Sequence, residues 1–248
     1  MIIKKNDEEI KDIRKACQIA AKALYSAGKV VKPGMTTKEL DSFIDAEIIK
    51  NGAKAAFKGY RGYRHASCLS VNNEVVHGIP SDRELSDGDI IGIDVGAIYN
   101  GFYGDTAKTF PVGKVSKSAK KLLQATEECL EKGIAAVKNG KRIGDLSHVI
   151  EEHATSRGYS VVKDLFGHGV GKQLHEDPLI PNFGKPGTGP RIESGMTFAI
   201  EPMLNIGKSD IETLDDGWTV VTADGSLSAH FEHTILVKND SVEILTKI

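Results

Sequence analysis

An approximate internal repeat constrains the fold of this chain more than any other feature. The segments VKPGMTTKELDSFIDAEIIKNG at 31–52 and VKNGKRIGDLSHVIEEHATSRG at 137–158 align at a constant offset of 106 residues, with six identities over 22 positions. Both copies read as a glycine-containing loop followed by a helix, and an apolar helical stripe precedes each of them. Chance similarity between two helical surfaces is the alternative interpretation. The repeat predicts two halves built on one plan.

Each half continues with a strand-rich segment. After the first helical pair come the runs SCLSV, DIIGIDVGAIY and GFYGDTAKTFPV, and after the second come SVVKDLF, MTFAIEPML, WTVVT and HFEHTILV. Thr36 and Glu39 have the spacing of a capping box, and Gly52 is placed to end a helix. We therefore expect an α+β fold with an antiparallel-rich sheet and its helices on one face. Residues 1–248 would form a single domain of two halves, about 1–115 and 116–248, joined near 113–118.

Composition and charge exclude several classes of protein. The 248 residues carry a formal net charge of -2, so no basic field across the whole chain points to nucleic acid. No run of 18 apolar residues occurs, and the N-terminal segment is too charged for a signal peptide. Cys17, Cys68 and Cys129 are too few and too widely spaced for a disulfide framework. We expect a soluble cytoplasmic protein that has no DNA or membrane partner.

Two aspartates in the first half interrupt apolar strands. Asn100-Gly101 is a strong signal for a two-residue hairpin turn, and a pairing of Tyr99 with Phe102 would set the register of its strands. Asp94 and Asp105 would then be diagonal neighbours on one face of the sheet, roughly 7–8 Å apart at the backbone. Aspartate is unusual in a strand interior, and a buried carboxylate needs a partner. Salt-bridged or turn-capping aspartates are the alternative interpretation.

The second half repeats this anomaly with glutamates. Glu201 interrupts MTFAIEPML and Glu232 interrupts HFEHTILV. Asp94 and Glu201 are 107 residues apart, close to the repeat offset, whereas Asp105 and Glu232 are 127 apart. The larger spacing requires a longer loop in the second half, which the polar residues 205–217 could supply. Pseudo-twofold symmetry would then bring four acidic side chains together between the halves.

Four clustered carboxylates repel one another unless cations neutralise them. Two divalent ions would balance the four negative charges. Oxygen ligands with one imidazole suit manganese, iron, cobalt or zinc. His168, in the string FGHGVG, is the best candidate for the imidazole because the glycines on both sides leave its ring accessible. Taken alone, such a histidine is more often structural, and the surrounding acidic residues reverse that expectation.

The order and spacing of these candidate ligands resemble the metal-binding set of the pita-bread metallopeptidases. The flanking strings are similar to those of type I methionine aminopeptidases. The matching strings are NEVVHGIP at 73–80, DVGAIYNGFYGDTAKTF at 94–110, GHGVGKQLHEDP at 167–178, FAIEPM at 198–203 and AHFEHTILV at 229–237. The resemblance covers almost the whole chain. It implies a pita-bread fold, in which two pseudo-symmetric halves form a curved antiparallel-rich sheet with helices on its outer face.

The resemblance also implies an activity and a metal centre. The family removes the initiator methionine from nascent polypeptides, with a preference for small second residues. Asp94 would chelate one ion, His168 and Glu201 would serve the other, and Asp105 and Glu232 would bridge both. The ions could be cobalt, manganese, iron, zinc or nickel. We expect a monomer that makes at most a transient contact with the ribosome.

Further site residues follow from the resemblance. His77 and His175 would act near the scissile amide, and Glu201 would carry a proton from water to the leaving amine. A methionine slot would be lined by Tyr60, Tyr63, Cys68, Leu174 and Trp218, together with His77 and His175. Relatives often carry Phe where this chain has Leu174, so the slot could be wider or differently shaped. Two structural alternatives stay open, because His77 could cap a turn and Tyr63 could be a packing residue.

Three other functions compete with this interpretation. A proline-specific aminopeptidase or dipeptidase would share the fold, but such enzymes usually carry a large extra N-terminal domain. A non-catalytic binding module of the same fold would lack some of the five ligands, and all five are present here. A ribosome-associated scaffold would use basic residues, although these also suit a solvated helical face. The basic candidates are Lys114, Lys117, Lys120 and Lys121, or Lys138, Lys141 and Arg142.

Overall fold

The four long helices reproduce the spacing of the sequence repeat. A computed structural model describes residues 2–248. Its helices are α1 (Asp7–Val30), α2 (Thr37–Lys50), α3 (Lys117–Ala136) and α4 (Ile143–Ser156), with a short 3₁₀ turn η1 at Tyr60–Gly62. The bounds of α2 and α4 differ by 106 residues at both ends, and the C-terminal ends of α1 and α3 differ by the same number. Two copies of one helical pair are therefore present.

Local capping explains where the first two helices begin and end. Asn6 with Glu9, and Thr36 with Glu39, form capping boxes in which each side chain bonds the other residue's backbone. The predicted capping box of α2 is thus confirmed. Beyond α2, Gly52 has a φ of 82°, in the left-handed region that favours glycine after a helix.

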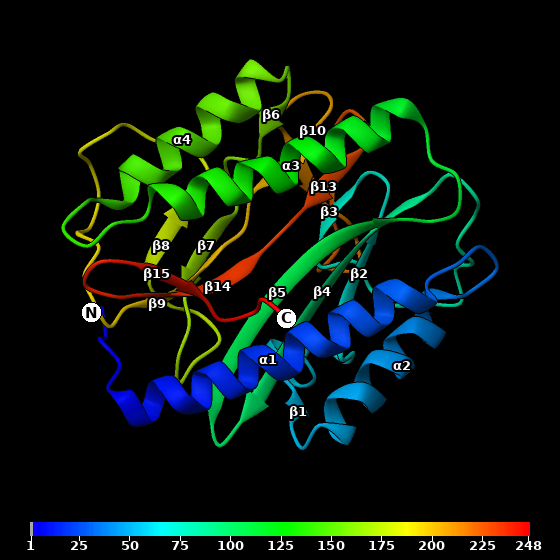
Figure 1. Ribbon diagram of the computed structural model, residues 1–248. Helices are drawn as coiled ribbons and strands as arrows, with labels where there is room; N and C mark the ends of the chain where they lie inside the picture. Colours follow the sequence, from blue (N-terminus) through cyan, green and yellow to red (C-terminus); the bar gives the residue numbers. More distant parts are fainter. Residues whose placement is uncertain (1) are drawn as a thin grey trace.

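The first half contains a sheet of four antiparallel strands. Strand β4 is central and pairs with β1, β2 and β5. The strands are β1 (Lys54–Ala55), β2 (Ser67–Val71), β4 (Ile90–Tyr99) and β5 (Phe102–Pro111). Figure 1 shows the long β4–β5 hairpin beside α1. The predicted hairpin turn at Asn100-Gly101 joins these two strands.

The second half forms a five-stranded antiparallel sheet in the order β15-β14-β9-β7-β8. Its strands are β7 (Phe166–Gly169), β8 (Glu176–Pro181), β9 (Thr197–Ile200), β14 (His233–Val237) and β15 (Val242–Ile244). A smaller sheet joins β6 (Ser160–Val161), β10 (Met203–Asn205) and β13 (Ser228–His230). Helices α3 and α4 lie together over the strands of this half in Figure 1.

The extra length of the second half is more ordered than we expected. Within the segment 205–217, predicted to be a polar loop, Ile211–Thr213 forms strand β11. It pairs with β12 (Val220–Thr222), which in turn pairs with β3 (Glu74–Val76) of the first half. A three-residue strand is too short to show a period in the sequence, so only the pairing reveals it. This small sheet ties the two halves together.

Helix α1 spans the seam between the halves. Its residues Ile10, Ile13 and Cys17 share a buried cluster with Leu236 and Leu245 from the C-terminal segment. Figure 1 accordingly places the C-terminus next to α1. Separate apolar cores lie under α1 and α2 in the first half and under α3 and α4 in the second. Among residues 2–248, no helix has the length and apolar character needed to cross a membrane.

The contact between α1 and β5 depends on a glycine. A Cβ on Gly104 would overlap the backbone of Ala16 and Cys17, so β5 approaches α1 as closely as it does only because no side chain intervenes. We predict that Gly104→Ala lowers the free energy of unfolding by about 1–3 kcal/mol. Urea unfolding of the metal-free protein measures this change.

The matched control is Gly92→Ala on the neighbouring strand. A Cβ there would lie 3.6 Å from its nearest neighbours, which is ordinary van der Waals contact. We expect its unfolding free energy to change by about 0.5 kcal/mol or less. Equal effects of the two substitutions would show that helix α1 does not require the close approach.

Candidate metal centre

The hairpin of the first half places two aspartates on one face. Strands β4 and β5 pair continuously over ten residue pairs, from Ile90 with Pro111 to Tyr99 with Phe102. This is the predicted register, and no bulge interrupts it. Asp94 and Asp105 are therefore diagonal neighbours whose side chains point the same way.

The second half presents its acids differently. The pair β9–β14 and the pair β10–β13 share one register, and Pro202 interrupts the ladder between them because it has no N–H to donate. This register puts Glu201 directly opposite Glu232. The Glu201 carbonyl, freed by the interruption, accepts a hydrogen bond of 3.0 Å from Nδ2 of buried Asn182. The two halves thus converge on four acids, diagonal in one and opposed in the other.

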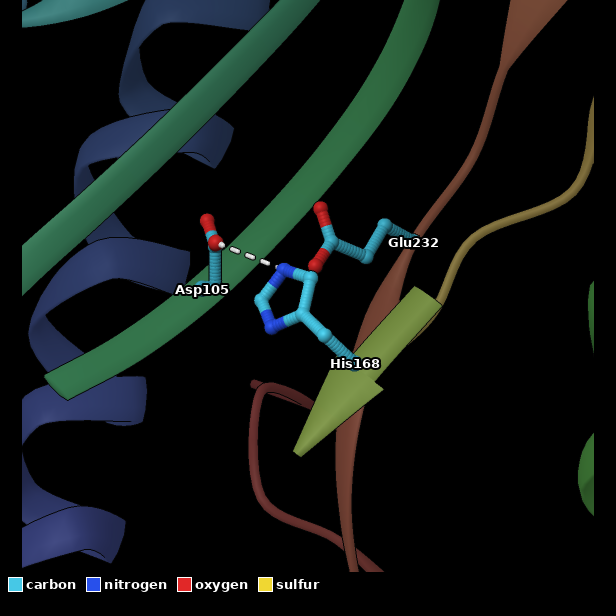
Figure 2. A group of neighbouring side chains, drawn as sticks. All are labelled: Asp105, His168 and Glu232. Carbon is cyan, nitrogen blue, oxygen red and sulfur yellow. Dashed lines mark ion pairs between the residues drawn. The ribbon is translucent and has the colours of Figure 1, made fainter. Parts of the chain in front are cut away.

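A histidine completes the cluster. His168 Nδ1 lies 3.0 Å from the carbonyl oxygen of Gly169, which can only accept, so Nδ1 carries the proton and Nε2 presents a lone pair. Nε2 lies 3.8 Å from Asp105 Oδ2 and 3.7 Å from Glu201 Oε1. Figure 2 shows Asp105, His168 and Glu232 pointing toward one another; Asp105 lies in β5, His168 in β7 and Glu232 between β13 and β14. One ligand atom of each lies within 4.8 Å of the others.

Unpartnered buried oxygens indicate what the cluster can hold. Asp94 Oδ1, Asp105 Oδ1 and Glu232 Oε1 are buried, and none of them has a hydrogen-bond partner in the structure. Buried carboxylate oxygens without a donor are costly, and a cation satisfies them. Four carboxylates and one imidazole lone pair form a donor set for divalent ions of the manganese to zinc series. The residues present therefore fit a divalent metal site.

The carboxylates also resist ionisation when no cation is bound. Burial, followed by the charge of Glu201, raises the pKa of Asp105 to about 7. Burial also raises the pKa of Glu201 to about 7. For Asp94 and Glu232 the same burial, reinforced by the charge of Asp105, raises the pKa well above its ordinary value. These directions follow from four acids sharing a site with little water.

All the residues predicted for this site line one pocket of about 160 Å³. The acidic cluster lies at one side, and an apolar and aromatic wall faces it. The lining residues are Phe57, Tyr60, Arg61, Tyr63, Cys68, His77, Asp94, Asp105, His168, Leu174, His175, Glu201, Trp218 and Glu232. The candidate metal ligands and the candidate slot residues therefore line a single cavity.

Two aromatic contacts hold His175 against the cluster. Its ring centroid lies 4.1 Å from that of His168, and it stacks on Tyr60 at 5.4 Å. The Tyr60 hydroxyl lies 2.8 Å from His175 Nδ1. These contacts orient the other ring nitrogen, Nε2, independently of any ligand.

His77 is held in an unusual backbone conformation. Its φ is 59°, in the left-handed region, and such strain is commonest at functional sites. The next residue, Gly78, lies so close to strand β2 that a Cβ on it would overlap the Leu69 carbonyl. Burial and then the imidazoles of His230 and His168 lower the pKa of His77 to about 4, so its ring is neutral at neutral pH.

Tyr63 has a bracing role as well as a lining one. Its hydroxyl hydrogen lies between two carbonyl acceptors, Ser67 O at 2.9 Å and Gly78 O at 3.1 Å. Its ring meets Trp218 edge-on at 5.0 Å. The sequence left open whether Tyr63 is only a packing residue. In the structure it lines the pocket and also packs against its neighbours.

Three residues of the site were missed from the sequence. Phe57 and Arg61 line the pocket, and Phe57 belongs to the same buried cluster as Leu174. The aromatic ring of Phe57 therefore lies in the part of the pocket wall where this chain has Leu174 in place of the larger Phe expected there. His230 Nε2 lies 3.5 Å from Glu201 Oε2. Its position two residues before Glu232, on the same face of an alternating strand, was the available signal.

A buried cluster of carboxylates and histidine on a duplicated α+β frame is the arrangement of a metallohydrolase. The family model described as metallopeptidase family M24 matches residues 11–239. Methionine aminopeptidase 1 of Bacillus subtilis is 50% identical over 248 residues, with full coverage of both chains. The chain therefore belongs to metallopeptidase family M24 and, within it, to the methionine aminopeptidases.

Solved structures agree with this assignment. Methionine aminopeptidase from Thermotoga maritima has a TM-score of 0.99 and 48% identity, and each chain is fully covered. Prolidase from Pyrococcus furiosus has a TM-score of 0.82 and 26% identity over 99% of this chain and 66% of its own. The predicted pita-bread fold, family and enzyme class are confirmed. Use of divalent metal follows from the family and the cluster.

Protons and metal ions should compete for this cluster. Because the pKa values of Asp105 and Glu201 are raised to about 7, both groups hold protons below that pH and must lose them to bind a cation. We predict that the affinity for Mn²⁺ rises roughly tenfold or more between pH 6 and pH 8. Titration calorimetry in buffers of different ionisation enthalpy measures both affinity and proton release.

The variant Glu201→Gln removes one competing proton and should show a shallower dependence on pH. An affinity that stays constant from pH 6 to pH 8 in the unsubstituted protein would contradict the raised pKa values.

Proposed function

We propose that this chain removes the N-terminal methionine from nascent polypeptides whose second residue is small, and that it uses two divalent metal ions. One observation carries the proposal. Every residue expected to bind metal, move protons or recognise methionine lines the same pocket. The activity named for the relatives of 48–50% identity supports it.

The acidic cluster would hold both ions. Asp94 would help to hold one ion, His168 and Glu201 would help to hold the other, and Asp105 and Glu232 would be shared between them. The unpartnered buried oxygens and the free lone pair of His168 support this assignment. Cobalt, manganese, iron, zinc and nickel all suit such ligands. When bound, the ions supply Lewis acidity and lower the pKa of water in the pocket.

Three side chains would handle protons and developing charge. Glu201 would take a proton from water and return it to the leaving amine, a role that its place in the pocket allows. If the Tyr60 hydroxyl donates to Nδ1 of His175, the proton of that ring sits on Nε2 and can stabilise the oxyanion. His77 forms a hydrogen bond with the scissile amide or the leaving nitrogen.

The aromatic wall would select methionine. Tyr60, Tyr63 and Trp218, with Phe57, offer polarisable contacts to a thioether, which prefers ring edges and faces. Cys68 lies directly opposite Asp94 across β2 and β4, at the junction between slot and metal ligands. Burial raises the pKa of the Cys68 thiol well above its ordinary value, so it remains protonated and acts as a small apolar wall.

The cellular setting is also part of the proposal. We place the chain in the cytoplasm as a monomer that meets polypeptide N-termini at or near the ribosome. Exposed lysines at the start of α3, including Lys117, Lys120 and Lys121, offer a basic surface for transient contact. A solvated helical face is the alternative explanation for the same side chains.

Peptide hydrolysis tests the central proposal. Purified protein stripped of metal should be inactive, and adding one divalent ion at a time should restore release of methionine from Met-Ala-Ser. Xaa-Pro peptides whose first residue is not methionine should be cleaved far more slowly, because their first side chain does not fill the methionine slot. Faster cleavage of Xaa-Pro peptides than of Met-Ala-Ser would move the chain to the proline-specific enzymes.

Two variants separate metal binding from stabilisation of the oxyanion. Glu232→Gln should lose both metal and activity, since it removes a bridging charge. His175→Ala should keep its metal and lose turnover by roughly 10²-fold, as expected for removal of one group that stabilises the oxyanion. Metal analysis beside kcat measures this difference.

His148→Ala is the control, because His148 lies on α4 outside the pocket. It should match the unsubstituted protein in both measurements. Metal loss in step with activity loss in His175→Ala would remove His175 from the proposed role.

A further inference from the structure

A buried ion pair lies outside the pocket, directly behind the segment that carries His175. Lys5 Nζ lies 2.7 Å from Glu176 Oε2, and the two side chains are only 3% and 7% exposed. Glu176 is the residue after His175 and begins strand β8. The pair joins positions 171 residues apart in the sequence.

Lys5 and Glu176 each form further hydrogen bonds, which hold them in place. The Lys5 backbone N–H donates to the Gly195 carbonyl at 2.8 Å, and Lys5 Nζ also donates to the Ile3 carbonyl at 3.0 Å. On the other side, Glu176 Oε1 accepts from the Gln173 backbone N–H at 3.1 Å. One carboxylate therefore connects the N-terminal segment to two points of the same loop.

The loop between β7 and β8 is also anchored at Val170, which exchanges hydrogen bonds with Thr197, and at Lys172, whose Nζ lies 3.2 Å from Glu9 Oε1. Gly171 accepts from the Tyr103 N–H and donates to Gln173, and the β7–β8 register shifts at Gly169. A Cβ on Gly171 would lie 2.6 Å from Glu176 Oε1 and 2.7 Å from Lys5 Cε. Glycine at this position thus lets the loop close over the ion pair.

Stability alone gives no reason for charges at this place. Two apolar side chains of similar volume usually stabilise a fold as well as a buried ion pair does, because desolvating the charges offsets their attraction. The charged pair adds a defined geometry, because a short charge-assisted hydrogen bond fixes the position of the Glu176 carboxylate. His175 directly precedes Glu176 in the chain, so the position of its ring depends on that placement as well as on its contacts with Tyr60 and His168.

We infer that Lys5 is a positioning residue, which through Glu176 holds His175 against the acidic cluster. The inference rests on the proposed function, in which His175 stabilises the oxyanion. Displacement of a catalytic group by about 1 Å can cost as much as 10²-fold in rate. Lys5 therefore contributes to turnover without touching substrate or metal.

Lys4 provides a matched control. It forms an ion pair with Glu193, but those side chains are 57% and 41% exposed. Lys4→Met should keep kcat for Met-Ala-Ser within about twofold, as expected for an exposed pair. Lys5→Met should lower kcat by about tenfold or more, with metal content unchanged.

A double-mutant cycle distinguishes positioning from general damage. In a His175→Ala background, Lys5→Met should change kcat by less than about twofold, since the residue it positions is already gone. The double variant Lys5→Met/Glu176→Met keeps an apolar pair in place of the charges, and it should remain folded but slow. An equal loss from Lys5→Met with and without His175 would overturn the inference. A double variant with full kcat would do the same.

Imidazole NMR gives a readout that needs no activity. The His175 ring resonances should shift in Lys5→Met and stay in place in Lys4→Met. If the unsubstituted protein did not cleave Met-Ala-Ser, the proposed function would fail, and the NMR comparison would still decide whether Lys5 positions His175. Unchanged His175 resonances in Lys5→Met would overturn the inference by themselves.

Discussion

Repulsion among four buried carboxylates is the interaction on which the rest of this structure depends. Asp94, Asp105, Glu201 and Glu232 come together where little water can solvate them, and burial raises their pKa values. Such a cluster is tolerable only with protons or cations. The framework that holds this cluster must be rigid. In a flexible framework the acids would move apart, because separation lowers their electrostatic repulsion, and the site would open. The continuous β4–β5 ladder and the hydrogen bond from Asn182 to the Glu201 carbonyl provide that stiffness.

The two halves share one helical plan but place their acidic residues differently. Helices α2 and α4 keep the 106-residue offset at both ends, so each half delivers acidic strands from the same kind of frame. The acids are nevertheless diagonal in one half and directly opposed in the other. The rings of His168 and His230 lie beside the two carboxylate oxygens of Glu201, at 3.7 and 3.5 Å. Two symmetric acid pairs alone would have offered no imidazole.

The substrate pocket is assembled from segments that have no local reason to meet. Its aromatic wall combines residues of segment 57–63, which includes η1, with Trp218 from the turn before β12, while Cys68 comes from β2 and His175 from the β7–β8 loop. Each contribution is fixed by a contact elsewhere, such as the bond from Tyr63 to the Gly78 carbonyl or the ion pair of Lys5 with Glu176. The candidate slot and the candidate metal ligands are therefore both held in place by contacts between distant segments, and the N-terminal segment takes part in them.

The sequence by itself determined the duplicated helices, the capping of α2, the register of the first hairpin and the five candidate ligands, because each depends on spacing along a single segment. The family motifs added His77, His175 and the methionine slot. Only the tertiary structure decided that Ile211–Thr213 forms a strand, that Phe57 fills the wall beside Leu174, and that Lys5 meets Glu176. These depend on close approach between distant segments, and no local periodicity records which distant segments will pack together.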